Sequence, residues 1–405
     1  MAPTTTLHLG VALEGAGWHP AAWREPNSRP AELFTPGYWT DLVTTAQRGL
    51  LDFVSIEDSL AVPGPRDPAD EAAVGLVRAR LDAHLIAARV APVTRGIGLI
   101  PTVTTTHTEP FHVATALATL DYTSRGRAGW QARVSATAAE AGHFGRRRVE
   151  DLSAAEIAAA RATGEFPAAV RELFDEAADV VEVVRRLWDS WEDDAEIRDV
   201  ATRRFIDRGK LHRVDFAGRF FSVRGPSITP RPPQGQPVVT ALAHAPLIYE
   251  FAARAADLVF VTPGRSAGPR PILDQVAAAA ERVGRAGEPL RVYADLVVFL
   301  DTATETGPRR LARLDERAGT EFASDAAIFA GSAETLAELL VDWHGQGVDG
   351  FRLRPGVAVD DLGAIADRLV PALRRRGVLR TGYPDGSLRT LLGLPATVPN
   401  RYATA

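Results

Sequence analysis

The chain of 405 residues contains no cysteine. This absence excludes disulfides, thiolate metal sites, iron–sulfur clusters and catalysis by a cysteine nucleophile. Lysine is nearly absent as well, because Lys210 is the single lysine among 46 basic residues. It lies in a polar, loop-like stretch, so we do not expect a Schiff-base mechanism, which depends on an activated lysine amine.

Long apolar runs and long basic runs are also missing. No uncharged apolar run of about 18 residues is present, so no membrane span is expected. The segment from Met1 to Leu7 has neither a basic start nor a long apolar core, and we therefore expect a cytoplasmic protein without a secretory signal. The net charge of −5 argues against nucleic acid and anionic membranes as partners.

Several short motifs that would mark other kinds of site are absent. The nine histidines show no paired ligand spacing with carboxylates, so no metal site is predicted. No Gly-x-Ser-x-Gly elbow indicates a serine hydrolase. No Gly-x-Gly-x-x-Gly follows the first apolar run, which weakens a dinucleotide-binding interpretation.

Short apolar runs alternate with helical segments along the chain. Hydrophobic residues make up 46% of the sequence, enough for a large core. The alternation predicts an α/β fold with a parallel sheet and helical crossovers. Eight strands favour a closed (β/α)8 TIM barrel over the alternative, an open doubly wound sheet. The expected strands are residues 7–13, 51–56, 96–100, 127–134, 237–242, 257–261, 292–300 and 350–353.

Two stretches interrupt this alternation. Residues 149–167 are alanine-rich and predict an extra helix. Residues 192–236 contain two short alternating runs around Ala217-Gly218, which predict a hairpin excursion outside the barrel. Neither stretch is typical of a domain linker, so we interpret residues 1–405 as a single domain. A long helix is also expected over residues 72–90.

The stretch Ser124-Arg-Gly-Arg-Ala-Gly-Trp130 predicts a tight turn into a buried strand. In a parallel barrel, ligands bind at the carboxyl ends of the strands. Asp58 and Thr104 stand at such ends, after the second and the third expected strand. Spacing alone leaves two interpretations of each residue open, a ligand contact or a turn and helix cap.

The same stretch resembles the Ser-Gly-Gly-Arg-Ala-Gly-Trp-Asn segment of the luciferase-like flavin monooxygenases. The similarity is greatest to the branch of nitrilotriacetate monooxygenase, dibenzothiophene sulfone monooxygenase and pristinamycin IIA synthase. It extends over nearly the whole chain, because further segments match the family in the same order. These segments are residues 21–24, 187–194, 222–226, 233–238, 369–377 and 392–395.

The resemblance implies a two-component monooxygenase that takes reduced FMN from a separate flavin reductase and oxidises a small organic substrate with O2. It also implies a homodimer. His19 lies in the loop after the first expected strand, where a histidine is either a surface or packing residue or a general acid/base that lines the substrate pocket. The resemblance assigns His107 and Gln131 to the substrate side. It assigns six to the cofactor, namely Asp58, Thr104, Trp130, Ser135, Phe174 and His244.

Several positions depart from the family pattern, three of them at expected cofactor contacts. Val170 and Phe174 stand where the family has a histidine and a tyrosine, and Ala245 replaces a serine of the phosphate loop. His244, just before a helix, is placed to meet a phosphate instead. The departures leave two alternatives open on the same barrel, a protein that uses the deazaflavin coenzyme and one that uses no flavin.

Overall fold

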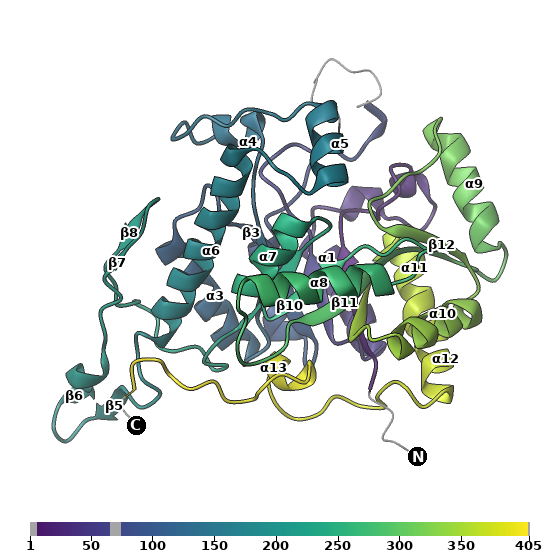
Figure 1. Ribbon diagram of the computed structural model, residues 1–405. Helices are drawn as coiled ribbons and strands as arrows, with labels where there is room; N and C mark the ends of the chain where they lie inside the picture. Colours follow the sequence, from purple (N-terminus) through teal and green to yellow (C-terminus); the bar gives the residue numbers. More distant parts are fainter. Residues whose placement is uncertain (1–5, 65–73, 404–405) are drawn as a thin grey trace. The chain divides into compact units, whose positions relative to one another are not determined.

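Eight parallel strands with intervening helices form a closed (β/α)8 barrel (Figure 1). The computed structural model of the chain describes residues 6–64 and 74–403. All eight predicted strands are present, with ends shifted by a few residues, so the predicted fold class is confirmed. They are β1 (His8–Leu13), β2 (Phe53–Ile56), β3 (Gly98–Thr104), β4 (Gly129–Arg133), β9 (Val238–Leu242), β10 (Leu258–Val261), β11 (Arg291–Leu300) and β13 (Gly350–Pro355).

The strands are buried on both faces, as expected when side chains fill a barrel on one side and helices cover the other. In β11, nine of ten residues are buried. Gly10 shows how closely the side chains pack. It is paired with Phe53 of β2, and a Cβ at Gly10 would lie 2.3 Å from the Phe53 ring. Glycine is therefore required at this point of β1.

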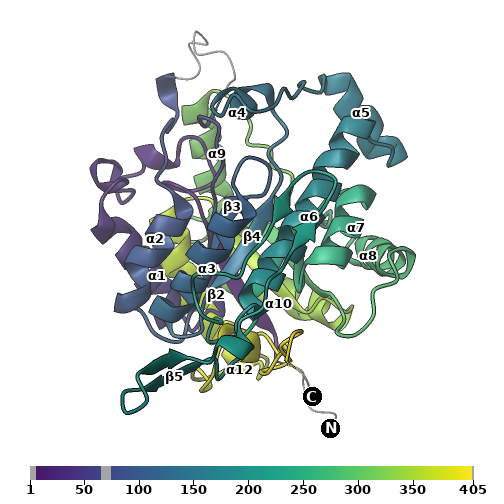
Figure 2. The same ribbon diagram turned by 90° about the vertical axis from the view of Figure 1, so that its left-hand side faces the viewer.

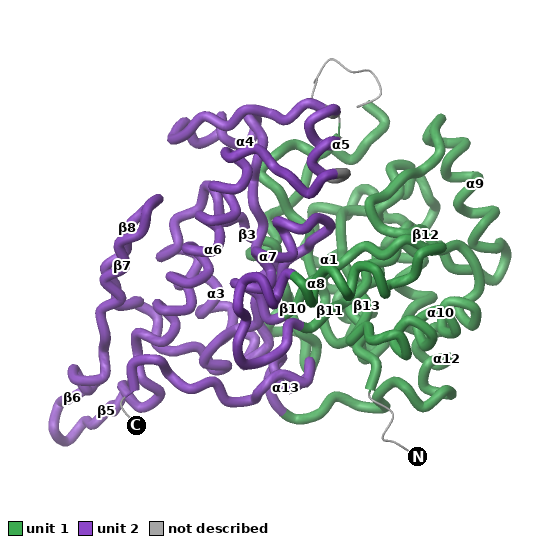
Figure 3. The backbone as a smooth tube through the Cα atoms, in the orientation of Figure 1, with its two compact units in different colours: residues 1–102, 258–278, 291–385 green, residues 103–257, 279–290, 386–405 purple. Residues whose placement is uncertain are grey.

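The chain divides into two compact units (Figure 3). Unit 1 comprises residues 1–102, 258–278 and 291–385. Within it, β11 pairs with β13 and, along its first residues, with β10. The later residues of β11 pair with β12 (Ala327–Gly331). This strand was not among those expected from the sequence. That residues 1–405 act as a single domain stays a prediction.

Unit 2 comprises residues 103–257, 279–290 and 386–405. Its barrel strands β4 and β9 pair in parallel. Helices α3 (Pro110–Ser124) and α6 (Ala168–Asp189) lie side by side (Figure 2), and α6 turns a stripe of buried residues such as Val180, Val184 and Leu187 to the interior. This pattern is typical of a helix that packs on a sheet.

Both predicted insertions belong to unit 2 and are confirmed. The alanine-rich stretch forms α5 (Ala154–Thr163), which begins with a capping box of Ser153 and Glu156. The excursion contains the predicted hairpin of β7 (Phe216–Ala217) and β8 (Ser222–Val223). It also holds an unpredicted antiparallel pair, β5 (Glu196–Asp199) and β6 (Arg204–Ile206).

The predicted helix over residues 72–90 is wrong in its first part. Helix α2 begins at Ala83, where Asp82 caps it, and ends at Val90. Residues 77–82 are not helical, and residues 72 and 73 lie outside the described part. Side chains of this non-helical segment, Val77 and Arg80 among them, line a cavity. Tertiary packing therefore overrides the local helical pattern.

The remaining longer helices follow the strands closely, as the alternation predicted. None of the helices in residues 6–64 and 74–403 is both long and apolar enough to cross a membrane. Their bounds are α1 (Pro36–Arg48), α4 (Ala138–Gly142), α7 (Pro246–Ala255), α8 (Arg270–Arg282), α9 (Gly307–Ala318), α10 (Ala333–Gly345), α11 (Ala358–Ala364), a π-helical stretch (Ile365–Leu369), α12 (Val370–Arg375) and α13 (Leu388–Leu391).

Candidate functional site

In unit 2, three hydroxyl side chains connect the segments that follow β3 and β4. Thr104, the last residue of β3, lies with its Oγ1 2.8 Å from Ser135 Oγ. The amide of Thr106 donates to Thr104 Oγ1 over 3.3 Å, and the amide of Ser135 donates to Thr106 Oγ1 over 2.8 Å. All three side chains are buried. Two predicted cofactor residues, Thr104 and Ser135, therefore lie together at the carboxyl ends of two barrel strands.

Trp130 and Gln131 belong to β4, the strand that precedes Ser135 of this hydroxyl cluster. Trp130 is fully buried, and its Nε1 donates to the carbonyl of Val103 over 3.0 Å. The indole N–H is therefore occupied by the protein, so only the ring could contact a flavin. Gln131 is buried as well. The cofactor role of Trp130 and the substrate role of Gln131 stay predictions.

His107 is buried and directly follows Thr106. Its ring stacks on Phe144, with centroids 4.9 Å apart and planes 9° from parallel. Burial lowers the pKa of His107, and the guanidinium of Arg147 lowers it further. Its Nε2 is inaccessible to solvent and has no hydrogen-bond partner among the described residues. A neutral imidazole with one unused nitrogen can donate to or accept from a ligand.

The positions that depart from the family pattern are apolar in their surroundings too. Phe174 is half-buried and packs against Phe251, with ring centroids 5.7 Å apart. Val170 lies one turn earlier on the same face of α6. His244 is exposed, and the buried Ala245 is the N-cap of α7 without a side-chain hydrogen bond. A serine cap would accept such a bond.

In unit 1, a cavity of about 250 Å³ lies against the loop after β1. His19 lines it, as predicted. His19 Nε2 lies 3.0 Å from Asp315 Oδ1, while Nδ1 accepts from the amide of Ala21 over 3.0 Å. Burial lowers the pKa of His19, although Asp315 opposes the shift. Both nitrogens are thus in use, and acid–base exchange with a substrate would require one of these bonds to break.

Asp58, also in unit 1, accepts hydrogen bonds from two backbone amides. Its Oδ1 accepts from the amide of Ser59 over 2.7 Å and its Oδ2 from the amide of Ala83 over 2.9 Å. Ala83 is the first residue of α2, so Asp58 fixes where that helix starts. Burial raises its pKa, and the two amides lower it. The capping interpretation left open by the sequence is therefore correct, and a flavin contact would be additional to it.

The sequence interpretation missed a buried charged cluster in unit 1. Asp295 of β11 accepts from Arg352 Nε over 2.9 Å and from Arg354 Nε over 2.8 Å. Arg352 also donates to Glu57 over 2.9 Å. The exposed fraction is 0% for Asp295 and Arg352 and 1% for Arg354. The signal that could have found it is the alternation Gly350-Phe-Arg-Leu-Arg-Pro355, which places both arginines on one face of a buried strand.

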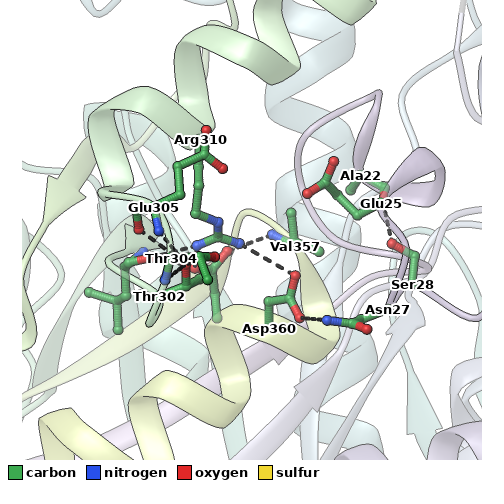
Figure 4. A network of polar contacts seen from close by, with 12 residues as sticks. Ala22, Glu25, Asn27, Ser28, Thr302, Thr304, Glu305, Arg310, Val357 and Asp360 are labelled. Atoms are coloured by element: carbon green, nitrogen blue, oxygen red, sulfur yellow. Dashed lines mark hydrogen bonds and ion pairs between the residues drawn. The ribbon is translucent and has the colours of Figure 1, made fainter.

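Further polar contacts fix the loop after β1. Asn27 Nδ2 donates to Asp360 Oδ1 over 3.1 Å, and Arg310 lies within 3.7 Å of the other oxygen of Asp360 (Figure 4). Glu25, nearly buried, receives two bonds from Arg313, of 2.6 and 2.9 Å. The Arg313 hydrogen bonds lower the pKa of Glu25 against the effect of burial. The loop therefore keeps a fixed position beside the cavity.

A metal site finds no support in the described part of the chain. Residues 6–64 and 74–403 contain no group of three or more His, Asp or Glu side chains placed to hold a metal ion.

Comparison with known proteins gives the family. The family described as luciferase-like monooxygenase matches residues 16–345. N-acetyl-S-(2-succino)cysteine monooxygenase of Bacillus subtilis (strain 168) is 28% identical, over 98% of each chain. Nitrilotriacetate monooxygenase component A of Aminobacter aminovorans is 29% identical, over 97% of this chain and 98% of its own.

A solved structure supports the same family. Riboflavin lyase, solved with modified FMN and its substrate riboflavin, superposes with a TM-score of 0.80 at 25% identity, over 96% of each chain. The match to nitrilotriacetate monooxygenase confirms the resemblance inferred from the Ser124–Trp130 stretch. The chain belongs to the luciferase-like monooxygenase family and is an oxidoreductase.

Proposed function

We propose that the protein is the oxygenase of a two-component system, which binds reduced FMN delivered by a separate reductase and oxidises a small organic substrate with O2. One oxygen atom of O2 enters the substrate and the other leaves as water. When bound, reduced FMN supplies the two electrons that this reaction requires. The family and the name "component A" of a relative support the proposal.

The observation that carries the proposal is the cluster of three hydroxyl side chains in unit 2, together with His107. Thr104, Thr106 and Ser135 form a buried polar wall. The unpaired Nε2 of His107 is a buried polar atom that the described residues leave without a partner. The polar edge of an isoalloxazine carries both donors and acceptors, so these residues fit it.

The proposal gives each residue a role. Thr104, Ser135 and Trp130 would hold the flavin ring, and His244, just before α7, would meet its phosphate. In unit 2, the proposal assigns Phe174 to the cofactor and His107 and Gln131 to the substrate. In unit 1, it assigns Asp58 to the cofactor and His19 to the substrate. The protein positions the flavin and excludes water from it, whereas the redox chemistry belongs to the cofactor.

An anaerobic titration tests the cofactor. We expect saturable binding of reduced FMN in the micromolar range, corresponding to about −8 kcal/mol. Thr104→Val should weaken it about five- to tenfold, because one hydroxyl contact is lost. Thr202→Val removes an exposed hydroxyl of unit 2 and should change nothing. Failure to bind either reduced or oxidised FMN up to about 1 mM would contradict the proposal.

A second candidate, a barrel that uses the deazaflavin coenzyme or no flavin, is favoured by the apolar side chains of Val170, Phe174 and Ala245. We expect the triple variant Val170→His, Phe174→Tyr, Ala245→Ser to bind FMN at least about tenfold more tightly, because each change adds a hydrogen-bonding group worth roughly 1 kcal/mol.

Ala168→Ser is the control for this variant, since it adds a hydroxyl at an exposed position of the same helix. It should leave the dissociation constant unchanged. An unchanged affinity in the triple variant would show that the flavin phosphate, if bound, lies elsewhere. The second candidate would then lose the observation that favours it.

A further inference from the structure

The cavity of unit 1 has a lining that indicates what it binds. We propose that it takes an uncharged organic molecule with an aromatic or aliphatic body and one hydrogen-bond acceptor, and that Trp18 Nε1 donates to this acceptor. The proposal rests on the proposed function only in taking this molecule as the substrate. The residues that line the cavity all belong to unit 1.

Three tryptophans line the cavity, and their indole N–H groups are not equivalent. Trp39 Nε1 donates to the carbonyl of Leu33 over 3.0 Å, and Trp23 Nε1 donates to the carbonyl of Gly75 over 2.8 Å. Trp18 Nε1 is shielded from solvent and has no partner among the described residues. A buried donor without an acceptor destabilises a protein, so an unused one beside a cavity indicates a ligand acceptor.

Trp18 is held in place before any ligand arrives. Its amide donates to the carbonyl of Pro355 over 3.0 Å, and the guanidinium of Arg354 lies 4.5 Å from its ring centroid. Gly17, the preceding residue, has φ of 130°, and a Cβ there would lie 2.4 Å from the carbonyl oxygen of Gly356. Only glycine allows this approach. A fixed donor loses little entropy on binding, which favours affinity.

The charges at the cavity argue against an anionic ligand. Two carboxylates, Glu14 and Glu57, belong to its lining. Arg80 donates to Glu14 over 3.0 Å, and Arg352 donates to Glu57. Among the described residues of the lining, Arg80 is the one arginine, and this ion pair engages it. A polycarboxylate such as nitrilotriacetate would meet two carboxylates and a single guanidinium, of which Nη2 already donates to Glu14 while the buried Nε has no partner among the described residues. The lining therefore carries more negative than positive charge, which disfavours an anion.

The remaining lining is apolar. Leu33, Phe34, Val77 and Leu81 join the indole rings. Such a surface binds a hydrocarbon body through burial of apolar area, while a single polar group fixes its orientation. Together these features select for a neutral molecule with one acceptor rather than for a charged one.

The test uses three probes of one shape, acetophenone, ethylbenzene and benzoate, with the full chain and without flavin. We expect acetophenone to bind about five- to tenfold more tightly than ethylbenzene, which lacks the acceptor, and benzoate to bind most weakly. In protein labelled with ¹⁵N at its seven tryptophans, the Trp18 indole N–H resonance should move on addition of acetophenone. It should move less with ethylbenzene.

Trp18→Phe identifies that resonance by its disappearance and should abolish the preference for acetophenone. Trp23→Phe is the matched control, since its N–H already has a carbonyl partner, and the preference should persist. Tighter binding of benzoate, an unchanged preference in Trp18→Phe, or no binding of any probe to the wild type would each overturn the proposal. Because flavin is absent throughout, a failure of FMN binding leaves this result standing, and the reverse also holds.

Discussion

Asp295→Asn is expected to lower the free energy of unfolding by about 3–5 kcal/mol, because it leaves two buried guanidinium groups without their shared counter-charge. Arg352 and Arg354 are 0% and 1% exposed, and both donate to this carboxylate. An asparagine amide offers one oxygen and directs an NH2 group at the cations. Since whole proteins have only about 5–15 kcal/mol of stability, the loss should be plain in urea unfolding curves.

The matched control is Asp274→Asn on α8, also in unit 1. Asp274 pairs with Arg270 at i, i+4 and is 60% exposed, so the loss should stay below about 0.5 kcal/mol. The double variant Asp295→Asn, Arg352→Met should lose less than the sum of the two single changes, because removing one cation relieves part of the uncompensated charge. Equal small losses for Asp295→Asn and Asp274→Asn would show that water reaches the cluster.

The cluster also bears on the proposed ligand cavity. Arg354 lies over the Trp18 ring and donates to both Asp295 and Asp325. The carboxylates therefore position the cation, and the cation positions the indole whose N–H has no partner within the described chain. A barrel interior that carries buried ions gains no stability over an apolar one. Here the buried ion pairs place a guanidinium over the ring of Trp18.

The strands were predictable because each is a short apolar run between polar turns, and a parallel barrel buries both faces. β12 was not, since only one of its five residues is fully buried, so it lacks the apolar signature of the other strands. The predicted helix over residues 72–90 was wrong in its first part, because the local sequence pattern there is helical and the structure is not. Its first part has a helical pattern, but Val77 and Arg80 line the cavity, a constraint that no local window contains.

The placement of Thr104 and Ser135 was predictable because position along a strand decides it, whereas their roles stay predictions. Thr104 and Ser135 follow neighbouring candidate strands, and they lie 2.8 Å apart. What a side chain already binds was not predictable. His19 is engaged at both nitrogens, and one of its partners, Asp315, is 296 residues away. Asp295 and Arg352 are 57 residues apart, so the pair has no local signal beyond charged residues within apolar runs.

Asp121 fixes the glycine-containing turn between α3 and β4. Its Oδ1 accepts from the amide of Ala128 over 3.1 Å, and its Oδ2 from the amide of Gln234 over 3.0 Å. The side chain of Gln234 adds a bond of 2.6 Å. The carboxyl is fully buried. It therefore couples the end of α3 to the glycine turn that places Trp130.

A dependence of stability on pH follows from the burial of Asp121. Burial raises its pKa to about 6, although the bonds from Gln234 and Ala128 lower it. An unfolded aspartate titrates near about 3.9, so between these values the folded chain binds more protons than the unfolded one. Stability then falls as the pH rises from about 4 to about 6, by roughly 3 kcal/mol in total.

Asp121→Asn removes this titration, and the difference between wild type and variant isolates it from the other carboxyls. We expect the wild type to lose roughly 3 kcal/mol relative to Asp121→Asn between about pH 4 and pH 6.5, in urea unfolding measured at each pH. If the wild type instead gained stability relative to the variant over this range, its three N–H donors would be keeping the carboxylate ionised. The turn before Trp130 would then be held by a permanent buried anion, and acid would release it.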